Sequence, residues 1–157
     1  MTFRYAHFLL VVACLAGGSA TAGTVDDNKA LVLKFIAAEN SRDFENLPTY
    51  VTEGFQRHSE ATPNAAVANR EQFIARMRDG LEVFPDARIH VQQVVAEGDR
   101  IAVWASYRDG ATGTAVDPTI DVDIVMMYRV EGDRIAELWA MWDNNALRSQ
   151  LEARSRK

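Results

Sequence analysis

The chain of 157 residues contains one cysteine, three histidines and four prolines. A single thiol, Cys14, has no partner for an internal disulfide, so a folded domain must rely on its apolar core. His58 and His90 lack the spacing of metal ligands, and neither a metal nor another cofactor is expected. The net charge is −5 and the basic residues are scattered, which argues against nucleic acid as a partner because it requires a clustered basic face.

The longest apolar run lies at the N-terminus. Arg4 precedes an apolar run over residues 8–15, and Ala20-Thr21-Ala22 has the small-x-small form of a cleavage site. This order is typical of a secretory signal peptide, and the run is too short to span a bilayer, which takes about 20 apolar residues. We therefore expect residues 1–22 to be an export signal and residues 23–157 to form one domain, periplasmic or secreted. The alternative is a lipoprotein anchored through Cys14.

Hydrophobic periodicity predicts helices first and strands afterwards. Helical spacing predicts four helices, over residues 25–42, 44–51, 70–84 and 145–153. Period-two alternation predicts four strands and one short extended segment, over residues 89–95, 101–107, 120–130, 134–143 and 55–58. Gly98-Asp99 and Gly132-Asp133 have the form of two-residue hairpin turns. The predicted class is α+β, with the N-terminal helices packed on a curved antiparallel sheet.

The last predicted strand combines carboxylates with large apolar side chains. If the strand alternates, one of its faces carries Glu137, Trp139, Met141 and Asp143. A carboxylate beside Trp139 and Met141 would be partly desolvated, which raises its pKa and suits it to acid or base chemistry near neutral pH. The competing interpretation is that Glu137 and Asp143 merely lie at solvent-exposed ends of the strand.

The second hairpin turn also predicts a register. Pairing of Glu131 with Arg134 places Tyr128 opposite Glu137, and residues opposite one another in an antiparallel pair share a face. The expected pocket wall then consists of Val122, Ile124, Met126, Tyr128, Glu137, Trp139, Met141 and Asp143. Such a wall is mostly apolar with a few polar groups, as in small-molecule sites. A slip of one residue would exchange the two faces.

Several segments follow an order and spacing found in one protein family. They are Tyr50-Val51, Phe55-x-x-His58, Phe84-Pro85-Asp86, the run 96–103, Tyr128-Arg129-Val130, Arg134-Ile135-x-Glu137-x-Trp139-x-x-x-Asp143 and Leu147-x-x-Gln150-Leu151. In these segments the chain resembles the SnoaL-like polyketide cyclases and ester cyclases of the nuclear-transport-factor-2-like (NTF2-like) superfamily. The resemblance covers nearly all of residues 23–157. It implies a cone-shaped α+β barrel.

The resemblance also implies roles for individual residues. In cyclases of this family the aspartate of the Trp-x-x-x-Asp pattern is the acid/base of an intramolecular aldol closure, which implies a catalytic role for Asp143. His58 is the second catalytic candidate, as a hydrogen-bond partner of a substrate oxygen. Substrate contacts are expected from Trp139, Glu137, Met141, Tyr128, Met126 and Phe55. The segment from Asp109 to Gly113 lacks the histidine that these cyclases carry there, which weighs against a polyketide substrate.

Three functions fit these expectations. The first is an exported lyase, isomerase or hydrolase that acts on a small, largely apolar carbonyl compound, with Asp143 as acid/base. The second is a non-catalytic protein that binds a small apolar ligand in the same pocket. The third is a module that uses its open sheet for dimerisation. The expected partners are accordingly a small apolar molecule and a second copy of the chain.

Overall fold

The computed structural model describes residues 23–58, 66–109 and 120–156. The predicted export signal, Cys14 and residues 110–113 lie outside these ranges. The elements are α1 (Val25–Ser41), α2 (Leu47–Tyr50), β1 (Val51–His58), α3 (Arg70–Val83), β2 (Arg88–Glu97), β3 (Arg100–Asp109), β4 (Ile120–Glu131), β5 (Arg134–Trp142) and α4 (Asn144–Ser155). None of the helices in the described ranges is both long and apolar enough to cross a membrane.

Helix α1 has well-defined ends. Thr24 and Asp27 form a capping box at its start, in which each side chain accepts a hydrogen bond from the backbone N–H of the other. Arg42 ends the helix in the left-handed conformation, with φ 59°. The prediction for this helix is confirmed. The helix predicted over 44–51 is much shorter, because only Leu47–Tyr50 are helical and Val51 already begins β1.

The five strands form one sheet in the order β1-β5-β4-β3-β2. Both predicted hairpins are confirmed: Glu97 pairs with Arg100 and Glu131 with Arg134, and Gly98 and Gly132 adopt positive φ angles of 56° and 64°. The expectation of a purely antiparallel sheet is wrong, because β1 runs parallel to β5. The sheet is therefore mixed, with one parallel pair at its edge.

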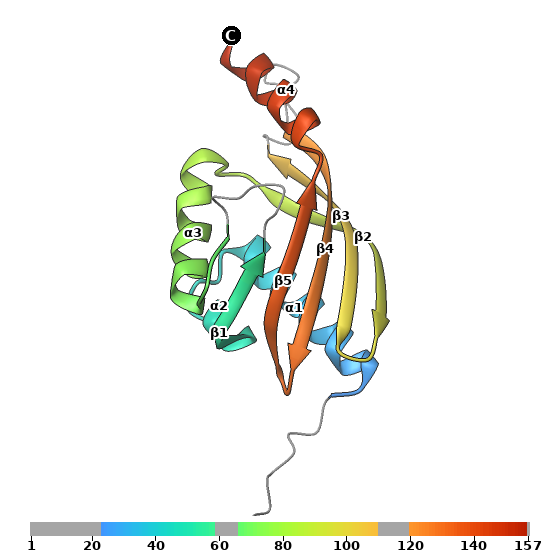
Figure 1. The fold of residues 1–157 in the computed structure, drawn as a ribbon. Helices are drawn as coiled ribbons and strands as arrows, with labels where there is room; N and C mark the ends of the chain where they lie inside the picture. Colours follow the sequence, from blue (N-terminus) through green and yellow to red (C-terminus); the bar gives the residue numbers. More distant parts are fainter. Residues whose placement is uncertain (1–22, 59–65, 110–119, 157) are drawn as a thin grey trace, which may run out of the picture.

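Helices α1 and α3 cover one face of the sheet, which we call the inner face, and the opposite face is the outer face. Figure 1 shows α1 crossing behind the sheet. Phe35 of α1 contacts Phe73 of α3 and Tyr128 of β4, with ring centroids 5.9 and 6.1 Å apart. Phe55 of β1 contacts Phe73 at 4.7 Å. These rings join both helices to the sheet, and each such buried side chain stabilises the fold by about 1.5–3 kcal/mol.

A β-bulge in β5 overturns the predicted register. Val130 pairs with Ile135, but Arg129 pairs with Glu137, so Ala136 is an extra residue in the ladder. In a regular strand, Ile135 would lie on one face of the sheet, and Leu138 with the even-numbered residues after it would lie on the other face. Only one of the two sets could then face the core. The bulge allows both to face the core, where Ile135 is 0% and Leu138 is 4% exposed. Beyond the bulge every side chain of β5 therefore lies on the face opposite to the expected one.

Candidate functional site

The predicted site residues are divided between two faces and one sheet end. Tyr128, Met126 and Phe55 are buried in the core on the inner face, each at most 2% exposed. In the register of β4 and β5, Glu137 lies opposite Arg129, Trp139 opposite Met127 and Met141 opposite Val125. These pairs all lie on the outer face. The prediction of one continuous pocket wall is therefore wrong, because the bulge places the predicted side chains of β4 and those of β5 on opposite faces of the sheet.

Asp143 has a different environment from the expected one. It is exposed, and its Oδ1 accepts hydrogen bonds from the N–H groups of Asn145 and Ala146 at 3.1 and 2.9 Å. These contacts make Asp143 the N-cap of α4. Strand β5 ends at Trp142 and α4 begins at Asn144, so the carboxylate lies at the junction. The expected desolvation is not present, and a catalytic role for Asp143 stays a prediction.

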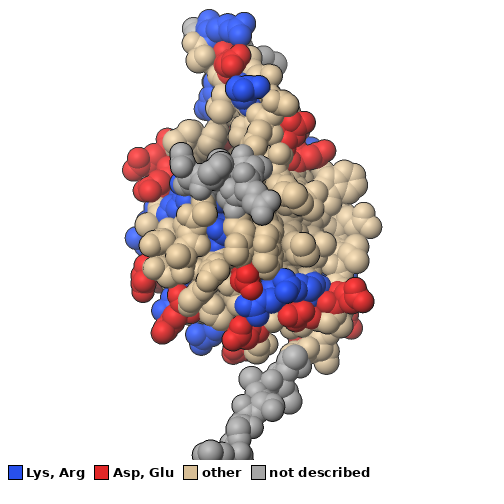
Figure 2. All heavy atoms as spheres, in the orientation of Figure 1, with Lys and Arg blue, Asp and Glu red and all other residues tan. Residues whose placement is uncertain are grey.

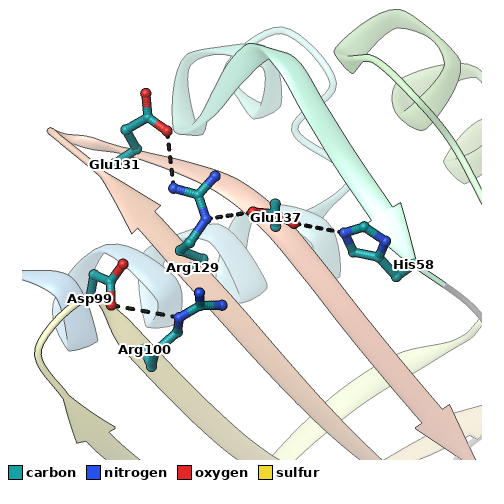
Figure 3. Close-up of polar contacts among 6 residues, drawn as sticks. All are labelled: His58, Asp99, Arg100, Arg129, Glu131 and Glu137. Atoms are coloured by element: carbon teal, nitrogen blue, oxygen red, sulfur yellow. Dashed lines mark hydrogen bonds and ion pairs between the residues drawn. The ribbon is translucent and has the colours of Figure 1, made fainter.

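The outer face carries a polar network centred on Glu137 (Figure 3). Nε2 of His58 donates to Glu137 Oε2 at 2.8 Å, and Nε of Arg129 donates to the other carboxylate oxygen. Arg129 also pairs with Glu131 at 3.0 Å. The His58 ring stacks on Trp139 with centroids 4.6 Å apart. The parallel pairing of β1 with β5 thus brings together three of the predicted residues, His58, Glu137 and Trp139.

This network holds Glu137 in its charged form. Hydrogen bonds from His58 and then from Arg129 lower the pKa of Glu137 below its ordinary value. A carboxylate that stays ionised and fully paired is a weak base at neutral pH. A hollow of about 300 Å³ adjoins the network, lined mainly by polar residues: Thr52, Gly54, Gln56, Arg129, Glu131, Ala136 and Glu137. The outer network is therefore better suited to hold strands together than to move protons.

The inner face carries a second glutamate, which the sequence analysis did not select. Glu39 lies in the last turns of α1, seven residues after the buried Val32 and four after the buried Phe35. This spacing places it on the core-facing side of the helix. Asn40 fixes this end of the helix, because its side-chain amide donates to the carbonyl of Ile89 and accepts from the N–H of Ile89, both at 2.8 Å.

Burial changes the acidity of Glu39 strongly. Desolvation raises its pKa to about 8, against the lowering effect of the Arg57 charge. Glu39 and Arg57 are nevertheless only half-buried by residue, so neither is sealed off completely. A carboxyl group with this pKa is mostly protonated at pH 7, with roughly one tenth in the ionised form. Such a group is suited to both donate and accept a proton near neutral pH.

The charge of Glu39 acts on two tyrosines whose hydroxyl groups lie on the inner face of the sheet. Its charge raises the pKa of Tyr128 and of Tyr107, although burial is the larger cause for both phenols. The pKa of Tyr107 reaches about 12. The Tyr128 hydroxyl donates to the sulfur of Met126 at 3.2 Å, which is a weak acceptor. We call Glu39, Arg57, Tyr107 and Tyr128 the inner polar group; α1, β1, β3 and β4 each contribute one member.

The sequence contains a signal for Glu39. The apolar stripe of the predicted helix 25–42 ends at Ala38, yet the spacing of Val32, Phe35 and Ile36 continues to position 39. A carboxylate at the next position of an apolar stripe is a buried-acid candidate. Arg57 lacked any comparable signal, because its inward orientation depends on the pairing of β1 with a strand about 80 residues later.

Metal ligands do not gather at either place. Within residues 23–58, 66–109 and 120–156, no group of three or more His, Cys, Asp or Glu side chains is placed to hold a metal ion. The chemistry open to the inner polar group is proton transfer by a carboxyl group, assisted by a guanidinium and two phenols.

Comparison with known proteins identifies relatives for most of the chain. The family model of the SnoaL-like polyketide cyclases matches residues 29–151. No curated protein matches the chain. Among solved structures, IdmH of Streptomyces antibioticus is 23% identical with a TM-score of 0.69, covering 80% of this chain and 98% of its own. A SnoaL-like protein of Jannaschia sp. CCS1 is 22% identical with a TM-score of 0.71, covering 83% of this chain and 96% of its own.

The similarity extends to structures grouped under other names. An NTF2-like protein of Cytophaga hutchinsonii is 19% identical with a TM-score of 0.60, covering 76% of this chain and 93% of its own. The family model confirms the predicted SnoaL-like family, and the solved structures confirm the predicted α+β class with an NTF2-like fold. At this level of identity the solved structures establish the fold alone.

Proposed function

Because the chain belongs to the SnoaL-like polyketide cyclase family, we propose that it binds a small, largely apolar carbonyl compound and transfers a proton on it, with Glu39 as the acid/base. The proposal is supported by the position of Glu39 on the core-facing side of α1, after the buried Val32 and Phe35, where burial raises the pKa of its carboxyl group to about 8. A perturbed carboxyl group among aromatic side chains is a candidate catalytic group.

The proposed reaction begins at the carbon next to a carbonyl. Ionised Glu39 takes a proton from that carbon, and the C–H electron pair moves into an enolate. The enolate carbon then forms a C–C bond to a second carbonyl of the same molecule, whose oxygen takes the proton back from Glu39. No co-reactant is consumed. The positive charge of Arg57, near enough to act on Glu39, supports stabilisation of the enolate oxygen.

Two alternatives remain as proposals. In the first, Asp143 is the acid/base with His58 as its partner, as the family pattern implies. In the second, the same interior binds a small apolar ligand without turnover. The half-buried position of Glu39 favours the Glu39 mechanism, since Asp143 is exposed and serves as the N-cap of α4.

The test follows deuterium exchange from solvent into the α-position of 2-tetralone, a small apolar ketone, by proton NMR. Glu39→Gln is expected to abolish the protein-dependent exchange, and Asp143→Asn to retain it. The matched control is Glu45→Gln, which changes an exposed glutamate just after α1. Loss of exchange in Asp143→Asn with retention in Glu39→Gln would transfer the role to Asp143. Ketone binding without any exchange would support the non-catalytic alternative.

Export and pairing belong to the same proposal. We propose that the chain is exported and cleaved near residue 22, and that two copies pair in solution. The Thr24 capping box that starts α1 lies just after the proposed cleavage site, a position that supports a domain beginning at Gly23 or Thr24. Intact-mass analysis of protein from the cell envelope tests this: a chain beginning at Gly23 or Thr24 is expected, and a lipidated chain beginning at Cys14 would favour the lipoprotein alternative.

A further inference from the structure

Glu39 lies close to the end of its helix, where a side chain is held least firmly. Helix α1 ends at Ser41, and the cap residue Arg42 donates its backbone N–H to the carbonyls of Ala38 and Glu39. The last carbonyls of a helix lack partners within it, and helix ends open more readily than helix middles. An acid/base in this last turn therefore depends on contacts from outside the helix to keep its carboxyl group in place.

Asn40 supplies such a contact. Its side-chain amide donates to the carbonyl of Ile89 and accepts from the N–H of the same residue, both at 2.8 Å. Ile89 belongs to β2, which is an edge strand of the sheet, so the Asn40 side chain takes the place of a neighbouring strand at this position. Two bonds from one planar amide to one residue fix the orientation of the helix end as well as its distance from the strand.

The residue that Asn40 binds is next to the inner polar group. In the register of β2 and β3, Ile89 lies opposite Tyr107, and residues opposite one another share a face. Tyr107 and Glu39 are close enough to interact: burial, and to a smaller extent the charges of Asp109 and Glu39, raise the pKa of the Tyr107 phenol to about 12. The bonds to Ile89 therefore set the position of α1 relative to the strand pair that carries this phenol.

We propose that Asn40 is a positioning residue, whose two bonds to Ile89 hold the carboxyl group of Glu39 at the inner face and at a fixed separation from the Tyr107 phenol. The inference rests on the proposed role of Glu39 as acid/base. Asn40 acts through the helix backbone, because neighbouring residues of a helix point in different directions and its own side chain is committed to β2.

Arg42 anchors the same end of the chain at a second place. Its guanidinium donates to the carbonyls of Pro85 and Ala87, which immediately precede β2. Arg42 lies beyond the helix, whereas Asn40 lies within the last turn and next to Glu39. Loss of the Asn40 bonds should therefore loosen the last turn of α1 while the following segment stays attached.

The surroundings of a carboxyl group decide its acidity, so a loosened turn is measurable. Figure 2 shows Asp and Glu side chains gathered around the margins of the face in view, where they meet solvent. Glu39 is half-buried by contrast, and burial raises its pKa to about 8. Movement of the helix end away from β2 would admit water to this carboxyl group, and its pKa would fall toward the ordinary value of 4.5.

The test compares two asparagines of the full protein. Asn40→Leu removes both bonds to Ile89 at a similar side-chain size, and the matched control Asn46→Leu changes an exposed asparagine whose amide donates to Asp43 at 2.9 Å. Carbon-detected NMR gives the titration midpoint of the Glu39 carboxyl group in each variant. The 2-tetralone exchange assay gives kcat and KM, and circular dichroism confirms that each variant is folded.

Asn40→Leu should lower the Glu39 midpoint by at least about one pH unit. It should lower kcat about 10²-fold, as for a displaced catalytic group, with KM changed less than about threefold. Asn46→Leu should match the wild type in all three quantities. A purely structural role of Asn40 would lower the Tm and leave the midpoint of the folded protein unchanged.

A second variant keeps the inference testable if Asn40→Leu does not fold. Asn40→Gln retains the amide but displaces it by one methylene group, and it should shift the midpoint and kcat in the same directions. A folded variant with the midpoint and kcat of the wild type would overturn the positioning role and leave Glu39 as the acid/base. A wild type without any exchange would overturn the proposed function, and the Glu39 midpoints would then decide the role of Asn40 by themselves.

Discussion

The two faces of the sheet each present a glutamate, and their chemistry is opposite. Glu39, on the inner side, has its pKa raised to about 8 because burial removes water from the carboxylate. Glu137, on the outer side, has its pKa lowered because His58 and Arg129 donate hydrogen bonds to it. The same residue type therefore responds to two different environments. Desolvation dominates at Glu39, whereas hydrogen bonds from His58 and Arg129 dominate at Glu137.

The largest expected difference between the two glutamates is in catalysis. Glu39→Gln should lower the rate of ketone deuterium exchange about 10²–10⁴-fold, as for loss of a general acid/base. Glu137→Gln should change that rate only slightly, because the wild-type carboxylate is already committed to its two donors. NMR exchange rates at equal protein concentration measure both. Equal losses of exchange rate in Glu39→Gln and Glu137→Gln would contradict the claim that only the glutamate of the inner face transfers protons.

The next effect is on stability as a function of pH. The folded-state pKa of Glu39 is raised from 4.5 to about 8, so between these values the unfolded chain releases a proton that the folded chain retains. The contribution of Glu39 to stability is therefore full below pH 4.5 and is lost as pH rises to 8, by on the order of 4 kcal/mol. Urea unfolding of wild type and Glu39→Gln at pH 5 and pH 8.5 measures it. The variant should lack this loss; parallel curves would contradict the raised pKa.

A smaller effect is expected at Asp143. Its replacement by alanine removes the two N-cap hydrogen bonds of α4 and should cost about 1 kcal/mol of stability, whereas asparagine caps almost as well as aspartate. Thermal or urea unfolding of Asp143→Ala and Asp143→Asn measures the difference. An exchange rate that falls in Asp143→Asn while stability is unchanged would point to a chemical role for this carboxylate after all.

The smallest effect concerns the outer network. Partly exposed ion pairs contribute about 0.2–1 kcal/mol, so His58→Ala should destabilise the protein only within that range, including its contact with Trp139. The lowered pKa of Glu137 adds stability that is present above pH 4.5 and is lost as pH falls through the folded-state value. A double-mutant cycle of His58→Ala and Glu137→Gln isolates the pair. A coupling energy of several kcal/mol between His58 and Glu137 would contradict the prediction that this ion pair contributes little to stability.

Much of the fold was predictable from local patterns. The hairpin turns followed from Gly-Asp pairs, and both glycines indeed adopt the left-handed φ that such turns require. Helix α1 followed from its apolar stripe and acidic start. The parallel pairing of β1 with β5 could not be predicted in this way, because no local turn connects strands so distant in the chain.

The candidate site was harder to predict because it depended on which side chains of β5 point to each face of the sheet, and these alternate along the strand. One extra residue, Ala136, reverses the facing of all later residues in β5. The sequence favours that bulge. Ile135 and Leu138 are both strongly apolar, yet a regular strand would place them on opposite faces of the sheet. Only the packing of the core decides where the extra residue is placed. Three of the predicted site residues, His58, Glu137 and Trp139, lie together, but on the outer face and not in an apolar pocket. Glu39 is not among the predicted residues.

The most direct test of the account is the acidity of Glu39 itself. Carbon-detected NMR follows the side-chain carboxyl carbons of Glu39 and Glu137 through a pH titration of one sample, with Glu39→Gln used to assign the first signal. The account predicts a midpoint near 8 for Glu39 and one below 4.5 for Glu137. A midpoint of Glu39 close to 4.5 would contradict the proposal that this face of the protein carries an acid/base.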